Sequence, residues 1–207
     1  MIQSAFIGSD AELVQRILAL HATGGRILDS TWGLGTFWRG RVAITRTGKP
    51  TVGIDRVHRA NGHQRNGRFL QADYTTLPFR AKAFDAIICD PPFVTRAGDS
   101  SIMGRRYTTN DSYETLLDGL TAASIEFARV LDTKGIVVIK LMDLTEGRRR
   151  RWAHLDVTAL WAPVFRLDDL FVKVGMTPLF SSSWKHQRRS RSAHTYFLVF
   201  RPRQRQR

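Results

Sequence analysis

Residues 84–93 read Phe-Asp-Ala-Ile-Ile-Cys-Asp-Pro-Pro-Phe, a short apolar run that ends on an acid and two prolines. An apolar stretch of this length, bounded by turn residues, is typical of a strand that is buried on both faces of a parallel sheet. The prolines cannot continue a central strand, because each lacks the N–H group that the ladder requires. The stretch therefore predicts a buried strand over 84–89 and a rigid turn that begins at Asp90.

The rest of the chain alternates between similar apolar runs and amphipathic segments. We expect further strands at 26–29, 51–55, 67–72, 135–141, 164–174 and 195–200, and helices at 10–21 (capped by Ser9 or Asp10), 111–131 and 152–161. The last two strands lack a long helix between them, which indicates an antiparallel pair. The pattern predicts one α/β domain over residues 1–207, with a doubly wound, mostly parallel seven-stranded sheet, an antiparallel C-terminal hairpin and a flexible basic tail at 201–207.

Charge is distributed unevenly along the chain. The net charge is +14, and residues 140–207 hold 15 of the 32 Lys and Arg residues but 5 of the 18 acidic residues. Such a concentration favours a polyanionic partner, because each neutralised phosphate releases a condensed counterion. The alternative is an ordinary solvated surface in an arginine-rich chain. On charge and pattern together we expect a nucleic acid.

Several classes of protein are disfavoured. The single cysteine, Cys89, cannot form an internal disulfide, and no apolar run is long enough to span a bilayer. Residues 1–10 lack the features of a secretory signal, so we expect a cytoplasmic protein without membrane contact. His186 and His194 have no partners at metal-ligand spacing, which predicts no metal. Monomer and homodimer stay open.

A glycine turn follows the strand at 26–29. Residues 29–36 read Asp-Ser-Thr-Trp-Gly-Leu-Gly-Thr, and Gly33 and Gly35 would let the backbone turn tightly and approach a ligand. A plain strand-to-helix turn is the alternative. The third glycine of the dinucleotide fingerprint is missing, and no Gly-Lys-Ser/Thr follows, so neither NAD nor ATP is expected.

Two acids end the next two strands. Asp55 lies about twenty residues beyond the glycines, where an acid can accept hydrogen bonds from ribose hydroxyls; otherwise it would pair with Arg56. Asp73 could bind an adenine amino group, or could simply be a turn residue. We assign Asp73 and the adjacent Tyr74 to the same nucleoside site.

The turn at 90–93 offers hydrogen-bond acceptors and few donors. Asp90 supplies a carboxylate, Pro91 and Pro92 supply carbonyl groups held by rigid rings, and Phe93 supplies a flat apolar face. An amino group on a planar ring fits such a surface, with the ring stacked on Phe93. Mere loop punctuation is the alternative. We predict Asp90, Pro91, Pro92 and Phe93 as the catalytic centre.

These motifs resemble a known family. Asp-Pro-Pro-Phe with an upstream Asp-x-x-x-Gly-x-Gly resembles the class I amino-methyltransferases, S-adenosylmethionine (SAM) enzymes with a Rossmann-like fold that act on adenine N6, cytosine N4 or guanine N2. Residues 27–38, 77–79, 140–143 and 194–200 resemble small phage and bacterial DNA modification methylases. The resemblance implies SAM as cofactor and a bacterial, archaeal or phage-encoded enzyme. Its cofactor-binding residues would be Asp29, Thr31, Gly33, Gly35, Asp55, Asp73, Tyr74 and Asp90.

The chain departs from the family in two respects. Thr31 stands where many relatives have phenylalanine, so one wall of the methionine pocket would differ. The chain also has no room for a target-recognition domain of the usual size.

The expected function is methylation of an exocyclic amino group of a flipped base, with adenine N6 in DNA favoured. The alternatives are an RNA methyltransferase acting on guanine N2 or adenine N6, and a non-enzymatic nucleic-acid-binding subunit with a methyltransferase fold. Basic and aromatic residues after the catalytic turn and before the last strand are expected to contact the nucleic acid, and residues 148–151 form another basic run. The predicted contacts are Arg105, Arg106, Tyr107, Trp184, Lys185, Arg188, Arg189 and Arg191.

Overall fold

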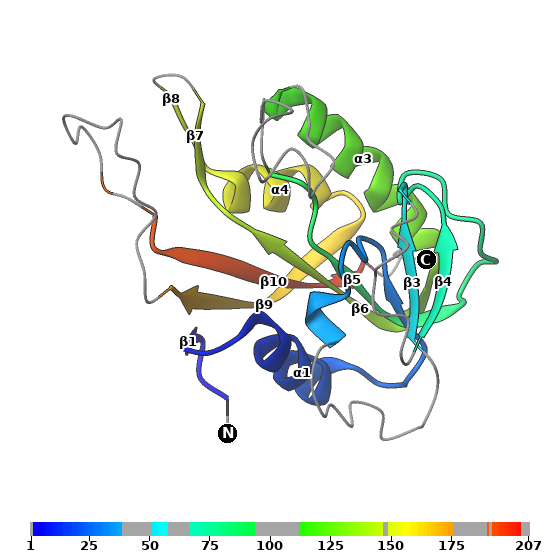
Figure 1. Cartoon of the computed structure of the whole chain (residues 1–207). Coiled ribbons are helices and arrows are strands. Elements are labelled where there is room, and N and C mark those ends of the chain that lie inside the picture. The colour runs from blue at the N-terminus through cyan, green and yellow to red at the C-terminus, as the bar shows by residue number, and fades with distance from the viewer. Residues whose placement is uncertain are drawn as a thin grey trace.

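A mixed sheet of eight strands runs through the computed structural model, with helices on both of its faces (Figure 1). The structure describes residues 2–38, 51–57, 67–93, 112–146, 149–175, 190 and 192–203. The sheet has the order β1-β9-β10-β6-β5-β2-β3-β4. Its strands are β1 (Ala5–Phe6), β2 (Ile27–Asp29), β3 (Thr51–Asp55), β4 (Gly67–Gln71), β5 (Phe84–Cys89), β6 (Leu131–Leu141), β9 (Phe165–Val174) and β10 (His194–Pro202).

The strands from β6 to β4 are mutually parallel, and β10 is antiparallel to both of its neighbours. The predicted α/β fold, with a mostly parallel sheet and an antiparallel C-terminal pair, is therefore confirmed. Over the residues that the structure describes, the sheet has eight strands and not seven, because Ala5–Phe6 pairs with β9. A two-residue strand is too short to show any periodicity in the sequence.

Among the described residues, the remaining elements are three helices, a 3₁₀ turn and a separate hairpin. They are α1 (Asp10–His21), α3 (Tyr113–Val130), α4 (Ala153–Trp161), the 3₁₀ helix η1 (Thr36–Trp38), and the antiparallel pair β7 (Leu144–Glu146) and β8 (Arg149–Arg151). Figure 1 shows β7 and β8 extending from the end of β6 away from the large sheet. The sequence predicted the second of these strands only as a basic run.

Local signals fix where the helices begin. Ser9 caps α1 by accepting a hydrogen bond from the backbone N–H of Glu12 at 3.1 Å, and Ser112 caps α3 in the same way through Thr115 at 3.1 Å. Near the C-terminus, strand β10 ends at Pro202 and so includes the first two residues of the segment 201–207, which was expected to be flexible.

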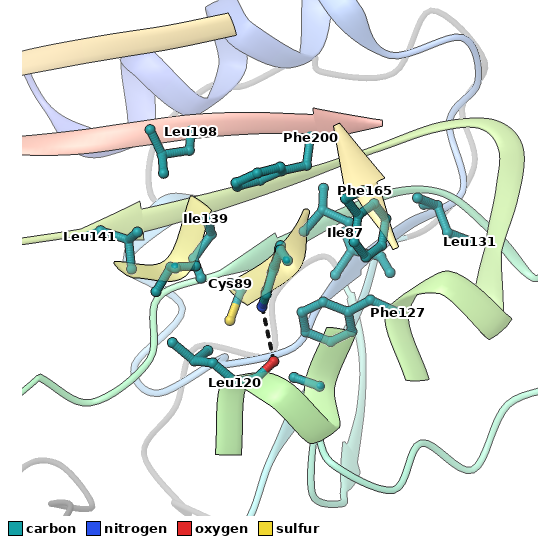
Figure 2. Close-up of a cluster of buried hydrophobic side chains, with 14 of the residues drawn as sticks. Ile87, Cys89, Leu120, Phe127, Leu131, Ile139, Leu141, Phe165, Leu198 and Phe200 are labelled. Atoms are coloured by element: carbon teal, nitrogen blue, oxygen red, sulfur yellow. Dashed lines mark hydrogen bonds between the residues drawn. The ribbon is translucent and has the colours of Figure 1, made fainter. Parts of the chain in front are cut away.

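Each face of the sheet buries a separate hydrophobic layer, because successive side chains of a strand point to opposite faces. Ile87 and Ile139 pack under α3 and α4, whereas Ile88 and Val138 pack against α1. Figure 2 shows the layer under α3 and α4. There the indole N–H of Trp161 donates to the carbonyl oxygen of Leu120 at 3.0 Å, which joins the two helices through the core.

Candidate functional site

The candidate site lies where the sheet changes its winding direction. From β2 the chain proceeds outward to β3 and β4, and it then returns to place β5 on the other side of β2. The carboxyl ends of β2 and β5 are therefore neighbours, with Asp29 opposite Ile88. Ligands of doubly wound proteins bind at this kind of switch point. Here the Thr31 hydroxyl accepts a hydrogen bond from the backbone N–H of Asp90 at 2.6 Å, which joins the two predicted motifs.

A pocket of ≈ 490 Å³ opens at this edge of the sheet. Its volume lies within the range usual for small-molecule and cofactor sites. The predicted residues that line it are Thr31, Gly33, Asp55, Tyr74, Asp90, Pro91, Pro92 and Phe93. The sequence thus brings the glycine turn, the acid after β3 and the turn after β5 to one cavity.

Asp29 is not among the residues that line the pocket. It is buried, and its carboxylate accepts hydrogen bonds from the backbone N–H of Thr31 at 3.1 Å and from the indole N–H of Trp38 at 2.6 Å. Burial raises the pKa of Asp29 to about 7, although both hydrogen bonds favour the ionised form. The structure thus places Asp29 where it can hold the glycine turn in shape.

Gly35 is also absent from the lining of the pocket. Gly33 and Gly35 have φ angles of 52° and 63°, which are strained for other residues. The buried ring of Trp32, which does line the pocket, packs against Gly35 and against Gly53 of β3. A Cβ atom at Gly53 would lie 2.1 Å from the Trp32 ring, so both glycines leave room for this tryptophan.

The two acids after β3 and β4 have different surroundings. Asp55 lines the pocket, and its carboxylate accepts hydrogen bonds from the backbone N–H groups of Gly33 at 2.8 Å and Val57 at 3.0 Å. Asp73 instead accepts from the backbone N–H of Thr75 at 2.9 Å and pairs with Arg56 at 3.3 Å. Asp73 is not among the lining residues, so the structure places it in a turn beside the site.

A series of ion pairs that the sequence did not predict reaches Asp90. The Lys140 ammonium group on β6 lies 3.0 Å from Oδ2 of Asp90 and 3.0 Å from Oδ2 of Asp10, at the start of α1. The other oxygen of Asp10 lies 2.6 Å from Nζ of Lys173 on β9. The signal in the sequence was a single lysine near the carboxyl end of an otherwise apolar strand.

The charged groups in this series of ion pairs shift one another's pKa values. Burial raises the pKa of Asp90 above its usual value, and the Lys140 ammonium group opposes that rise. Burial would lower the pKa of Lys140, but the Asp90 and Asp10 carboxylates raise it above its usual value. Although burial acts against them, Lys140 and Lys173 lower the pKa of Asp10. Lys140 therefore stays protonated and supports the ionised form of Asp90.

The predicted nucleic-acid contacts lie outside the described residues. They are Arg105, Arg106, Tyr107, Trp184, Lys185, Arg188, Arg189 and Arg191. Within the described part of the chain, no three His, Cys, Asp or Glu side chains gather as a metal site would require. None of the helices in that part is long and apolar enough to cross a membrane.

Comparison with solved structures finds the same architecture in several proteins. TrmN from Thermus thermophilus matches with a TM-score of 0.58 and 18% identity, over 93% of this chain and 48% of TrmN. A TehB-like SAM-dependent methyltransferase from Corynebacterium glutamicum gives 0.52 and 19%, over 91% and 86% of the two chains. A protein from Pyrococcus horikoshii OT3 gives 0.54 and 16%, over 94% of each chain. The sequence matches no protein-family model and no curated protein. The fold is thus that of a Rossmann-like methyltransferase.

Proposed function

We propose that the protein is a SAM-dependent methyltransferase that acts on an exocyclic amino group of a nucleic-acid base, with adenine N6 in DNA as the favoured target. The observation that carries the proposal is the position of Asp90. Its carboxylate follows a central strand at the switch point and lines the same pocket as Gly33 and Asp55. The net charge of +14 supports a polyanionic substrate.

The residues of the pocket fit the proposed cofactor. SAM carries an adenosine group, and it supplies a methyl group on a positively charged sulfur atom. Gly33 lines the pocket, where its positive φ angle and its lack of a side chain leave room for the cofactor. Asp55 offers acceptor oxygens for ribose hydroxyls, and Ala72 and Tyr74 provide an apolar wall for the adenine ring. Thr31 and the residues beside it would complete the binding site.

Asp90 is held in a defined orientation. Its backbone N–H donates to Thr31, and its Oδ2 atom contacts Lys140. Among the residues that the structure describes, no hydrogen bond reaches Oδ1. We propose that this oxygen and the Pro91 carbonyl accept the two hydrogens of the target amine, while the ring of Phe93 stacks on the base.

These contacts would make a poor nucleophile reactive. The lone pair of an aromatic amine is delocalised into the ring, and acceptors for both of its hydrogens favour the pyramidal nitrogen that has a localised lone pair. As the nitrogen gains positive charge, the Asp90 carboxylate stabilises it more strongly, and this preference is specific to the transition state. No covalent bond to the enzyme is needed. The base would leave its stack at a cost of a few kcal/mol.

The experiment measures the transfer of a labelled methyl group from SAM to DNA, to total RNA and to protein, followed by mass spectrometry of the nucleosides. The wild type should label DNA, as N6-methyladenine. D90A should lose transfer at least about 100-fold while it still binds SAM in calorimetry, because it removes transition-state contacts. D55A should instead weaken SAM binding. D118A, which removes an exposed carboxylate of α3, is the matched control.

Other outcomes would redirect or overturn the proposal. Label in RNA alone, as N2-methylguanine or N6-methyladenine, would move the substrate to RNA. If wild type failed to bind SAM, the protein would be a nucleic-acid-binding subunit without activity. Near-normal turnover by D90A would refute the proposed role of Asp90.

A further inference from the structure

A chain of aromatic rings leads from the β7–β8 hairpin to the edge of the pocket. Trp152 meets His154 edge to face, with ring centroids 6.3 Å apart, and His154 stacks on Tyr196 at 4.1 Å. Tyr196 meets His194 at 5.0 Å. We call these four residues the ring ladder. Tyr196 pairs with Leu141 of β6, which lines the pocket, so the ladder adjoins the proposed active site.

The inner part of the ring ladder is fixed by hydrogen bonds. Nδ1 of His154 lies 2.8 Å from Oδ1 of the buried Asp143, and Nε2 of His194 lies 2.9 Å from the Tyr196 hydroxyl. These contacts set the planes of the rings. The outer end is different, because Trp152 is 50% exposed. A large, half-exposed aromatic ring is a ready stacking surface.

Two arginines accompany the exposed ring. The Arg150 guanidinium group lies over Trp152, 5.4 Å from the ring centroid, and it donates to the hydroxyl of Ser192. Arg149, its neighbour on β8, is exposed. No acidic side chain in the described part of the chain forms an ion pair with either. Both positive charges are therefore available to an outside partner.

The base of the hairpin is anchored to α3. Arg151 contacts Glu114 at 2.5 Å and Glu146 at 2.9 Å, and Glu146 also accepts a hydrogen bond from the backbone N–H of Tyr113 at 3.1 Å. The charge of Arg151 is thus neutralised within the fold, whereas no acid of the described residues pairs with Arg149 or Arg150. These contacts hold the base of the hairpin that carries Arg149 and Arg150.

We infer that the ring ladder and these two arginines hold the single-stranded nucleotide next to the target base, with its base stacked on Trp152 and its phosphates near Arg149 and Arg150. The inference rests on the proposed function for the nature of the substrate. Stacking on an aromatic ring beside arginines is how many proteins bind unpaired strands without reading sequence.

The test is the affinity of the full-length protein for a fluorescent single-stranded oligonucleotide and for its duplex at fixed salt concentration. W152A should weaken single-strand binding about ten-fold, because one stacked base is lost. W152F, which keeps an aromatic face, should restore most of the affinity. L155A removes another exposed apolar side chain of the same region, and R80Q removes an exposed arginine of the loop before β5; both should bind as wild type does.

Methyl transfer gives the second measurement. W152A should raise KM for the oligonucleotide and leave kcat and the affinity for SAM unchanged. The inference is overturned if W152A binds and reacts like wild type, or if W152F is as impaired as W152A. It is also overturned if W152A changes self-association in sedimentation but not oligonucleotide binding, since the surface would then bind protein. Failure of the proposed function is separate: wild type would transfer no methyl group to any nucleic acid, and the binding assay would still test the ladder.

Discussion

At the scale of single residues, the environment of Asp90 leads us to predict how methyl transfer depends on pH. The Lys140 ammonium group opposes the rise in the pKa of Asp90 that burial causes. K140M removes the charge, so the pKa of Asp90 should rise further and the acid limb of the plot of kcat/KM against pH should move to higher pH. K140R keeps the charge and should leave the limb near its wild-type position. An unshifted acid limb in K140M would show that Lys140 does not act through Asp90.

The buried carboxyl group of Asp29 leads to a second prediction, about how the stability of the protein depends on pH. Its pKa is about 7 in the folded protein, above the ordinary 3.8, so the folded state binds more protons than the unfolded state between these values. Stability should therefore fall as pH rises from about 4 to about 7, by on the order of 4 kcal/mol in total for this group. Chemical denaturation across this range measures the slope.

The control for Asp29 is D29N. Its amide cannot ionise, so the slope between pH 4 and 7 should flatten. Absolute stability should drop, because an amide nitrogen must face the indole N–H of Trp38 or the backbone N–H of Thr31, which both donate to the carboxylate in wild type. Equal slopes in the two proteins would contradict a buried, protonatable Asp29.

At the scale of elements, Gly53 of β3 supports the pocket because it has no side chain and leaves room for Trp32. G53A would place a Cβ atom 2.1 Å from the ring of Trp32, which lies on the pocket wall. The ring must move, so we expect a loss of about 1–3 kcal/mol in stability, as in overpacked cores, together with weaker SAM binding. Denaturation and calorimetry measure the two effects separately. Unchanged SAM affinity would show that the position of Trp32 is not needed for the cofactor.

The elements also show what a sequence can predict. Mostly apolar runs bounded by turn residues identified β3 and β5 to the residue, because a strand that is buried on both faces has few polar side chains. Ala5–Phe6 became a strand only because β9 offered an open edge, a contact between residues far apart in the chain. The sequence did not predict the β7–β8 hairpin, because the three consecutive arginines of β8 show no alternation of polar and apolar residues.

The candidate site likewise has a part that the sequence predicts and a part that it does not. Glycines and acids at strand ends located Gly33, Asp55 and Asp90, because their positions follow from the order of the elements. Ion pairs do not follow from that order. Arg56 pairs with Asp73 and not with the adjacent Asp55, and the link from Lys140 to Asp10 depends on where α1 begins relative to the sheet.

At the scale of the whole molecule, the net charge of +14 matters only through the charges that a partner can reach. Arg16 and Arg129 pair with acids of their own helices, at 2.7 Å in both cases. Arg149 and Arg150 have no such partners among the described residues, and they lie on the hairpin that extends beyond the sheet (Figure 1). If the protein binds a nucleic acid, we therefore expect counterions to be released at this hairpin.

The dependence of binding on salt tests this distribution of charge. For a single strand, the logarithm of the binding constant falls against the logarithm of salt concentration with a slope of roughly −0.7 for each phosphate contacted. The double variant R149Q/R150Q should therefore flatten the wild-type slope by about 1.4. R16Q removes an exposed arginine that is already paired with Glu12, and should leave the slope unchanged. Equal slopes in R149Q/R150Q and wild type, or equal flattening in R16Q, would mean that the basic hairpin contributes no more than the general field of a cationic protein, and that the strand is held elsewhere.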